Sequence, residues 1–227
     1  GTDENYPGKT DIIQSMALGG ITRGVYNLEM TAAYAAIANG GEYIEPILYT
    51  QVLDHDGNVL LDNTTPDTRQ VLKDSTAYLL TSAMEDVVTG SGGTGGTARM
   101  SNMPVAAKTG TSQESNDLWI SAFTPYYTAS VWGGYDSNKA MSGQSQSWHQ
   151  RLWKNIMERI HENLAYKDFT IPTSVVQKSI CTTTGLLATS SCPSRTEYFA
   201  EDNVPTQSCT GHYSYRDHDD DDDDDDT

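Results

Sequence analysis

Apolar residues recur at helical spacing in four stretches of the chain. The spacing predicts helices over residues 11–19, 28–39, 74–89 and 147–164. Asn27 and Asp74 are the expected N-caps of the second and third helices, because short polar side chains accept hydrogen bonds from first-turn N–H groups. In the fourth helix one apolar stripe is expected to face the core, formed by Trp148, Leu152, Ile156, Ile160 and Leu164.

A second set of stretches has the composition of β-strands. Residues 42–62 are β-like around an Asp56-Gly57 turn signal, which predicts a hairpin. Strands are also predicted over residues 105–111, 118–123 and 128–135. Only short turns separate these three strands, so we expect an antiparallel meander. The fold class is therefore α/β, or α+β, with an antiparallel sheet packed by helices.

Charge is concentrated at one end of the chain. The net charge is −17, and Asp217 together with residues 219–226 contributes a large share of it. This run repels itself and cannot bury surface, so we expect a disordered, solvated tail, with calcium binding as the alternative. An acidic chain also argues against nucleic acid as a partner, because phosphate binding requires clustered Lys and Arg.

No stretch of the sequence has the apolar length of a membrane span, and the opening residues lack the pattern of a secretory signal. We interpret Gly1 as an arbitrary cut. Any membrane anchoring is then expected only through sequence upstream of it.

The candidate chemistry lies in Lys108-Thr109-Gly110-Thr111, called the motif below, which falls in a predicted strand after the Gly/Thr-rich stretch 90–96. Lys108 supplies a fixed positive charge, and Thr109 and Thr111 supply hydroxyls, which together could hold a substrate carboxylate. Gly110 leaves room for a ligand backbone at the strand edge, and the Thr111 N–H is a candidate oxyanion-hole donor. The alternative interpretation is an exposed strand end followed by a turn.

Lys-Thr-Gly is one of three motifs shared by class A β-lactamases and penicillin-binding proteins. Together with Gly93-Thr94-Gly95 and the Cys-containing stretch 181–212, it makes residues 12–215 resemble the transpeptidase domain of class A (bifunctional) penicillin-binding proteins. The resemblance implies a penicillin-binding transpeptidase/β-lactamase-like fold that is incomplete at its N-terminus.

The resemblance also implies a function for the parent protein. It would be a serine D,D-transpeptidase that acylates itself on a stem peptide ending in D-Ala-D-Ala, then passes the acyl group to an amine. It would bind β-lactams, need no cofactor, and work on the extracytoplasmic, wall side of the bacterial membrane. Carried over to this chain, the catalytic residues are Lys108 and Thr111, and the substrate-binding residues are Lys108, Thr109, Gly110 and Thr111.

Several departures from the family pattern limit this interpretation. No serine has Lys three residues later, none begins Ser-x-Asn, and Ala107 replaces a Gly that is common in the family. Both missing motifs lie upstream in the family, so we expect a fragment that lacks the nucleophile and is inactive alone. The alternatives are a D,D-carboxypeptidase or β-lactamase-like hydrolase, and a non-catalytic penicillin-recognition module.

The composition changes after residue 165, where Pro, Thr, Ser and Cys accumulate. We expect three parts: residues 1–165 as the C-terminal portion of the transpeptidase domain, 166–215 as a Cys-containing extension, and 216–227 as the disordered tail. Cys181, Cys192, Cys209 and His212 have the ligand types of a Cys₃His zinc site but lack a paired Cys-x₂-Cys. One disulfide with an odd thiol is favoured over free thiols or zinc, and no metal site is assigned.

Three further interpretations concern single residues. Trp119 and Trp132 fall on adjacent strands, where core packing is favoured over a role in a substrate groove. Asp117 could orient the loop after the motif or simply end a turn. The histidines at positions 55, 149 and 161 are expected at the surface with no functional role.

Overall fold

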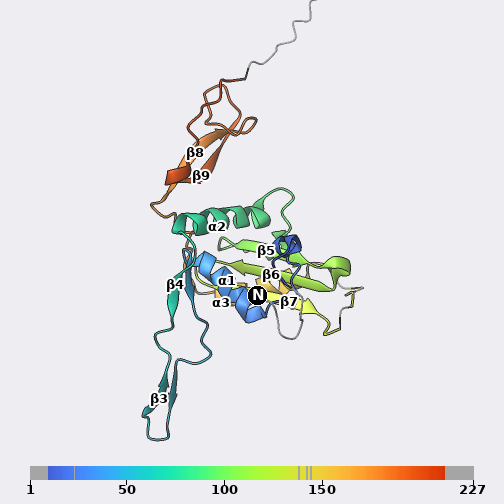
Figure 1. The fold of residues 1–227 in the computed structure, drawn as a ribbon, viewed down its shortest axis with the longest axis vertical. Helices are drawn as coiled ribbons and strands as arrows, with labels where there is room; N and C mark the ends of the chain where they lie inside the picture. The colour runs from blue at the N-terminus through green and yellow to red at the C-terminus, as the bar shows by residue number, and fades with distance from the viewer. Residues whose placement is uncertain (1–9, 23, 138, 142, 144, 213–227) are drawn as a thin grey trace, which may run out of the picture. The chain divides into compact units, whose positions relative to one another are not determined.

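A computed structural model describes residues 10–22, 24–137, 139–141, 143 and 145–212 of the chain. It divides into two compact units, Gly1–Pro172 and Thr173–Thr227 (Figure 1). The acidic tail and the expected limit at residue 216 lie outside the described residues.

The first unit is built on a three-stranded antiparallel sheet. Its strands are β5 (Ala106–Thr111), β6 (Asp117–Phe123) and β7 (Thr128–Gly134), in the spatial order β5-β6-β7. The register places Lys108 opposite Ser121, and Trp119 opposite Trp132. The predicted meander is confirmed, and with it an antiparallel sheet packed by helices.

Three helices surround this sheet: α1 (Asn27–Ala38), α2 (Asp74–Thr89) and α3 (Trp148–Ile160). In Figure 1, α1 lies in front of the sheet, α3 lies behind it, and α2 runs beside β5. One core cluster joins α3 and the end of α2 to one face, through Val88, Ala98, Met100, Met103, Val105, Ala107, Ile120, Ala122, Trp153 and Met157. A smaller cluster on the other face contains Met84, Ala106 and Phe123, with Tyr34 and Ile37 of α1 packed against it.

The helix starts differ from the expected caps by one residue. Asn27 and Asp74 are the first helical residues, and Tyr26 and Lys73 precede them as caps. The Glu29 carboxylate accepts a hydrogen bond from the Tyr26 N–H at 2.9 Å, so the first turn of α1 is closed by Glu29 rather than by Asn27.

The apolar stripe predicted for the fourth helix is wrong at three of its five residues, whereas Leu164 packs against the larger core cluster as expected. Leu152, Ile156 and Ile160 are 42%, 46% and 48% exposed, while Trp153 and Met157 are buried against the sheet. The Trp153 indole N–H also donates to the Ala129 carbonyl at 3.0 Å. A large aromatic that both fills the core and satisfies a buried carbonyl therefore decides which face turns inward.

Two of the histidines expected at the surface are instead buried. His161 is fully buried and shares hydrogen bonds of 2.7 Å with the Thr124 hydroxyl and the Met157 carbonyl. His149 is buried at the start of α3, and burial lowers its pKa. His149 lies in the first turn of α3 and His161 directly follows its last residue, whereas His55 is exposed as expected.

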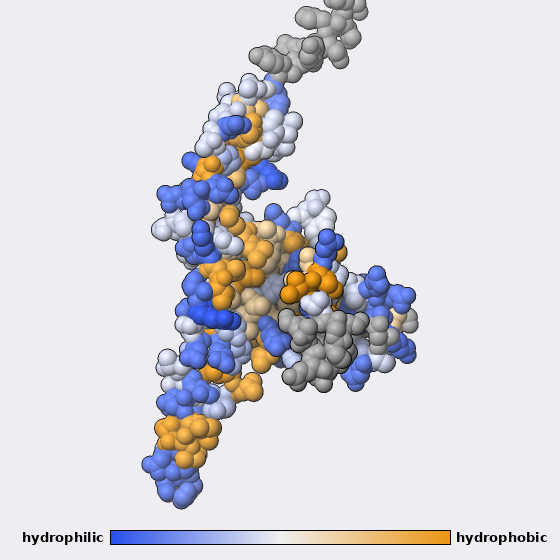
Figure 2. Space-filling view, in the orientation of Figure 1, coloured by the Kyte–Doolittle hydropathy of each residue, from blue (hydrophilic) through white to orange (hydrophobic). Residues whose placement is uncertain are grey.

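Two small β-ladders come between α1 and α2 in the sequence. Strands β1 (Glu42–Ile44) and β4 (Thr68–Gln70) pair with each other, and β2 (Gln51–Leu53) pairs with β3 (Val59–Asp62). The predicted hairpin is confirmed at β2–β3, where the Asp54 carboxylate accepts hydrogen bonds from the N–H groups of Asp56 and Asn58. Apolar side chains remain exposed on this hairpin (Figure 2), namely Val52, Leu53, Val59, Leu60 and Leu61. The sequence did not predict β4.

The helix expected over residues 11–19 is only a short 3-10 helix, Gln14–Leu18. No residue in it is buried, and Leu18 is 94% exposed. Helical spacing without a surface to pack on gives an isolated helix little stability, and Gly19, with φ of +84°, ends it.

The second unit contains one antiparallel pair, β8 (Val175–Cys181) and β9 (Ser194–Ala200), followed by a 3-10 helix at Glu201–Asn203. Neither strand was predicted from the sequence. Within the portion of the chain that the structure describes, no helix combines the length and apolar character needed to cross a bilayer.

Candidate functional site

The motif lies on β5, an edge strand of the described three-stranded sheet. Side chains alternate along a strand, so Lys108 and Gly110 share one face while Thr109 and Thr111 share the other. Helix α2 contacts β5, whose first two residues, Ala106 and Ala107, are fully buried. The strand becomes accessible at Lys108, whose ammonium is exposed and donates to the Thr109 carbonyl at 2.8 Å. Within the described sheet, β5 pairs only with β6, so the edge of β5 beside the motif has no strand partner.

The Gly93-Thr94-Gly95 loop is fastened to the motif. The hydroxyls of Thr94 and Thr109 share a hydrogen bond of 2.7 Å, and the Gln150 side-chain amide donates to the Thr94 carbonyl at 3.0 Å. A Cβ at Gly93 would come within 2.4 Å of the Val87 carbonyl oxygen, so only glycine lets the loop pass so close to α2. Together, α2, the loop and α3 fix where the Thr109 hydroxyl lies.

Aromatic side chains lie beside the motif on the Lys108 face. Gly110 pairs with Trp119, and Trp119 pairs with Trp132, with ring centroids 6.4 Å apart and planes tilted by 50°. The expectation that both indoles belong to the core is wrong, because Trp119 is only half-buried and Trp132 is 39% exposed. A Cβ on Gly110 would lie 3.3 Å from the Trp119 Cβ, so glycine also relieves crowding across the strand pair.

Asp117 ties down the turn that follows the motif. Its carboxylate accepts hydrogen bonds from the Ser112 hydroxyl at 3.0 Å and from the Trp132 indole N–H at 2.9 Å. Its own N–H donates to the Ser112 hydroxyl at 2.8 Å. Of the two interpretations left open for Asp117, the structure supports the loop-orienting one. Inside this turn Glu114 and Ser115 both have φ of +57°, a left-handed conformation that costs energy in residues other than glycine.

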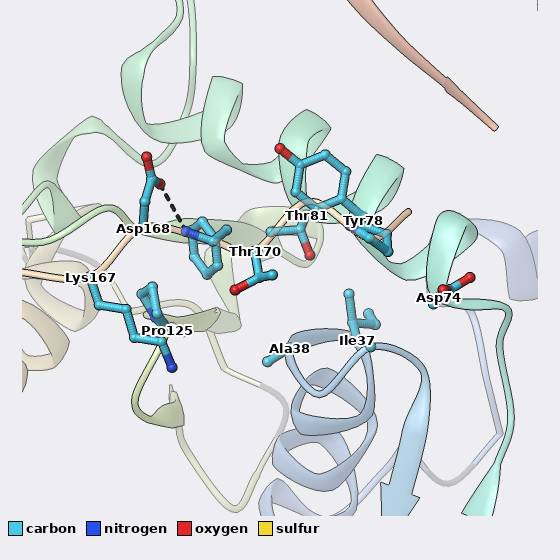
Figure 3. A pocket seen from close by; sticks show the side chains of 12 residues that line it. Ile37, Ala38, Asp74, Tyr78, Thr81, Pro125, Lys167, Asp168 and Thr170 are labelled. Atoms are coloured by element: carbon cyan, nitrogen blue, oxygen red, sulfur yellow. Dashed lines mark hydrogen bonds between the residues drawn. The ribbon is translucent and has the colours of Figure 1, made fainter. Parts of the chain in front are cut away.

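A cavity elsewhere in the first unit contains no motif residue. It measures about 190 Å³ and lies between the end of α1, helix α2 and residues 167–172 (Figure 3). Tyr78 and Thr81 line one side, and the Asp168 carboxylate accepts the Phe169 N–H at 2.8 Å beside them. Lys167, Thr81 and Thr170 also line this cavity, so it has polar groups of its own that are separate from the motif.

The side chains of the motif strand are of types that can bind a ligand carboxylate and polarise a ligand carbonyl. An exposed ammonium, two hydroxyls and an accessible backbone edge can hold an extended peptide that ends in a carboxylate. No Ser-x-x-Lys nucleophile accompanies them in the 227 residues. The motif strand was predicted from the sequence. The Thr94–Thr109 and Gln150–Thr94 hydrogen bonds were not, because they depend on how the Gly-rich loop folds.

Comparison with known proteins identifies the family. The family model described as penicillin binding protein transpeptidase domain matches residues 1–158. The chain belongs to this family. A second model, described as the C-terminal domain of penicillin-binding protein 1A, matches residues 171–214 of the same transpeptidase-family chain. The resemblance expected from the motif and its surroundings is thus confirmed.

Curated relatives agree with this family. Penicillin-binding protein 1A from Clostridium botulinum is 37% identical over 202 residues, which cover 86% of this chain and 24% of that protein. Penicillin-binding protein 1A from Clostridium acetobutylicum is 41% identical over 165 residues, which cover 73% of this chain and 20% of that protein. The chain therefore spans about a quarter or less of the length of these relatives.

Solved structures agree with the fold. Penicillin-binding protein 1A from Haemophilus influenzae superposes with a TM-score of 0.72 at 23% identity, covering 86% of this chain and 34% of that one. PonA1 from Mycobacterium tuberculosis in complex with penicillin V superposes with a TM-score of 0.61 at 27% identity, covering 70% of this chain and 44% of that one. The penicillin-binding transpeptidase fold expected from the sequence is confirmed.

Proposed function

We propose that this chain supplies the carboxylate-binding wall of a serine D,D-transpeptidase that crosslinks peptidoglycan. The proposal rests chiefly on one observation: the exposed ends of Lys108 and Thr111 lie on an open strand edge, and the Thr109 hydroxyl is fixed there by Thr94. Such an edge suits a stem peptide that ends in D-Ala-D-Ala, because the extended backbone can lie along the strand with its terminal carboxylate near the cation.

Each motif residue has a role in this proposal. The Lys108 ammonium on one face of β5 and the hydroxyls of Thr109 and Thr111 on the other hold the terminal carboxylate of the donor peptide where it lies at the strand edge, between the two faces. Gly110 keeps the strand edge free of a side chain, and the Thr111 N–H stabilises the oxyanion that forms as a serine attacks the penultimate carbonyl. Thr111 therefore acts on the reacting atoms as well as on the bound peptide, whereas Lys108 acts on the terminal carboxylate.

β-Lactams are proposed as inhibitors of the same site. PonA1 from Mycobacterium tuberculosis, a structural relative of this chain, is described in complex with penicillin V. We place the parent protein on the wall side of the bacterial membrane, where its peptidoglycan substrate lies.

Carboxylate recognition can be measured without the nucleophile. The 227-residue chain is titrated with an N-acetylated peptide ending in D-Ala-D-Ala and with the C-terminal amide of the same peptide, while backbone NMR signals are followed. The acid should shift the signals of residues 108–111 and the amide should not, because only the acid carries the charge that Lys108 binds. Equal responses to both peptides, or an unchanged response in Lys108→Gln, would contradict the proposed role.

The nucleophile is proposed to lie on a segment that this sequence does not include. The isolated chain should then form no covalent band with fluorescent penicillin on denaturing gels, whereas the whole Clostridium botulinum relative serves as the positive control. A stable labelled band on the chain would overturn this part of the proposal.

The lack of Ser-x-x-Lys also favours a second candidate, a non-catalytic penicillin-recognition module. The gene sequence around Gly1 separates the two. An upstream Ser-x-x-Lys in the same reading frame supports the transpeptidase, and a frame without one supports the module. A hydrolase of the D,D-carboxypeptidase type would instead release D-Ala from the donor peptide without any acceptor amine.

A further inference from the structure

The second unit brings together four side chains from three separate stretches of the sequence. The ligand atoms of Cys181, Cys192, Cys209 and His212 all lie within 4.8 Å of one another. The Nε2 atom of His212 is 3.0 Å from the Cys181 Sγ and 3.5 Å from the Cys209 Sγ. Tetrahedral zinc, with bonds of about 2.3 Å to sulfur and about 2.0 Å to nitrogen, places its ligand atoms roughly 3.6–3.8 Å apart.

We propose that Cys181, Cys192, Cys209 and His212 bind one zinc ion as a structural Cys₃His site. Three thiolates and one imidazole form a soft, closed ligand set, which suits tetrahedral zinc better than the oxygen-preferring cations. The sequence spacing argued against metal because it contains no Cys-x₂-Cys, but the fold supplies the proximity that the spacing lacks. The disulfide favoured from the sequence is also not formed, since all three cysteines are free in the structure.

Backbone hydrogen bonds anchor two of the ligands, Cys181 and Cys209, to the adjacent residues Leu186 and Leu187. The Cys181 N–H donates to the Leu186 carbonyl, and the Cys209 N–H donates to the Leu187 carbonyl, both at 2.8 Å. Leu187 also forms β-bridges with Ile180 and with Ser208, the residues just before these two cysteines. Cys181 and Cys209 are therefore positioned by the fold itself rather than by contact between their side chains.

The other two ligands are positioned by tight turns. Gly211 has φ of +98°, and a Cβ there would lie 2.8 Å from the Ser191 hydroxyl, so glycine allows His212 to turn back beside Cys209. The Cys192 sulfur is 3.4 Å from the Thr189 N–H and 3.2 Å from the Thr189 hydroxyl. Donors of this kind stabilise a metal-bound thiolate and orient it.

The second unit also needs a crosslink for its stability. Its described part spans residues 173–212, and the buried residues with apolar character are Val175, Ile180, Cys181 and Cys209. Domains of about 40 residues seldom fold on apolar burial alone and usually carry metal or disulfides. Half of this small buried set consists of proposed ligands, so zinc binding would supply much of the folding free energy of the unit.

Metal analysis of the purified chain tests the proposal. The 227-residue chain is prepared reduced, without a metal-affinity tag, exposed to zinc and dialysed, and its zinc is measured by mass spectrometry. We expect one zinc per chain. Cys181→Ser, Cys192→Ser, Cys209→Ser and His212→Ala should each lose it, whereas His55→Ala, which changes an exposed histidine outside the cluster, should keep it.

Two controls distinguish this site from zinc held elsewhere on the chain. The acidic run 219–226 could hold zinc by itself, so the measurement is repeated with these residues changed to Asn. Zinc that disappears with the run but survives the ligand substitutions would mean an adventitious ion only. Thr189→Ala keeps all four ligands and should weaken zinc about 10-fold in competition with a chelator, as loss of an outer-shell partner does.

Metal binding can also be measured on the unsubstituted chain, so the test does not depend on whether the variants fold. Cobalt(II) in place of zinc should give the visible bands and sulfur-to-metal charge transfer of a tetrahedral thiolate site. A reduced, unchanged chain that binds no zinc or cobalt would overturn the proposal. So would a disulfide between two of the three cysteines that persists in chain prepared without reductant and supplied with zinc.

Discussion

At the scale of single residues, the site depends on side chains whose positions are set by neighbours. Thr109 would be an ordinary strand threonine without the 2.7 Å contact to Thr94, and Thr94 is in turn held by Gln150 from α3. A hydroxyl that is already oriented loses less entropy when it binds a carboxylate. The proposed binding wall therefore includes Thr94 and Gln150 as well as the four motif residues.

Glu85 on α2 gives a pH-dependent prediction. Burial, followed by the nearby carboxylates of Asp168 and Asp86, raises the pKa of Glu85 to about 7. Its contribution to stability is therefore fully present below about pH 4.5, where the carboxyl is protonated in both states, and is lost as the pH rises through about 7. Glu85→Gln should change little at pH 4.5 and stabilise the chain by about 1 kcal/mol at pH 8, a value reduced for the partial exposure of the group.

Urea unfolding at the two pH values measures this effect. Glu158→Gln is the matched control, because Glu158 lies on α3 in a solvent-accessible pair with Lys154, 3.6 Å away. The control should show no comparable dependence on pH. An equal gain for Glu85→Gln at both pH values would contradict the role given to ionisation.

At the scale of elements, α3 shows that the amount of apolar surface does not decide which face is buried. Its inward face carries Trp153 and Met157 together with buried polar residues, whereas Leu152 and Ile156 point outward. Shape and a hydrogen bond to the Ala129 carbonyl outweigh the simple stripe.

Substitutions on the two faces of α3 should differ strongly. Trp153→Ala removes a fully buried side chain from the larger core cluster and should cost about 3–5 kcal/mol of unfolding free energy. Ile156→Ala, at a residue that is 46% exposed, should cost less than about 1 kcal/mol. Denaturant unfolding with tryptophan-independent detection, such as circular dichroism, compares them.

If Trp153→Ala does not fold, Trp153→Phe keeps a smaller aromatic ring but loses the indole N–H and its hydrogen bond, and should still destabilise the chain by about 1–2 kcal/mol. Similar losses from Ile156→Ala and Trp153→Phe would mean that the outward face of α3 is covered in solution.

At the scale of the whole molecule, sequence reasoning worked where pattern and tertiary contact agree. The β5–β7 meander, α1 and α2 have clear periods, so their positions could be predicted within about two residues. For the β2–β3 hairpin the Asp56-Gly57 signal located the turn but not the strand ends, since the β-like stretch began at residue 42 and β2 begins at Gln51. The motif strand was found for the same reason.

The sequence failed where contacts between distant segments decide the outcome. The 11–19 stretch has helical spacing but no surface to pack on, and β8–β9 is a short, largely polar ladder with little apolar period. The Cys₃His cluster was discounted because its spacing along the chain is irregular, although the ligand atoms lie close together in space. The hydrogen bonds around Thr94 depend likewise on how a flexible loop folds.

The open edge of β5 has one more consequence, for the solution behaviour of the molecule. Unpaired strand edges invite pairing between copies, and an exposed lysine is a common obstacle to such pairing. Lys108 is that lysine on the exposed part of β5, so the charge proposed to hold the substrate also keeps molecules apart. Lys108→Ala should therefore increase self-association in analytical ultracentrifugation, an effect that Lys167→Ala, at an exposed lysine outside the strands, should not reproduce.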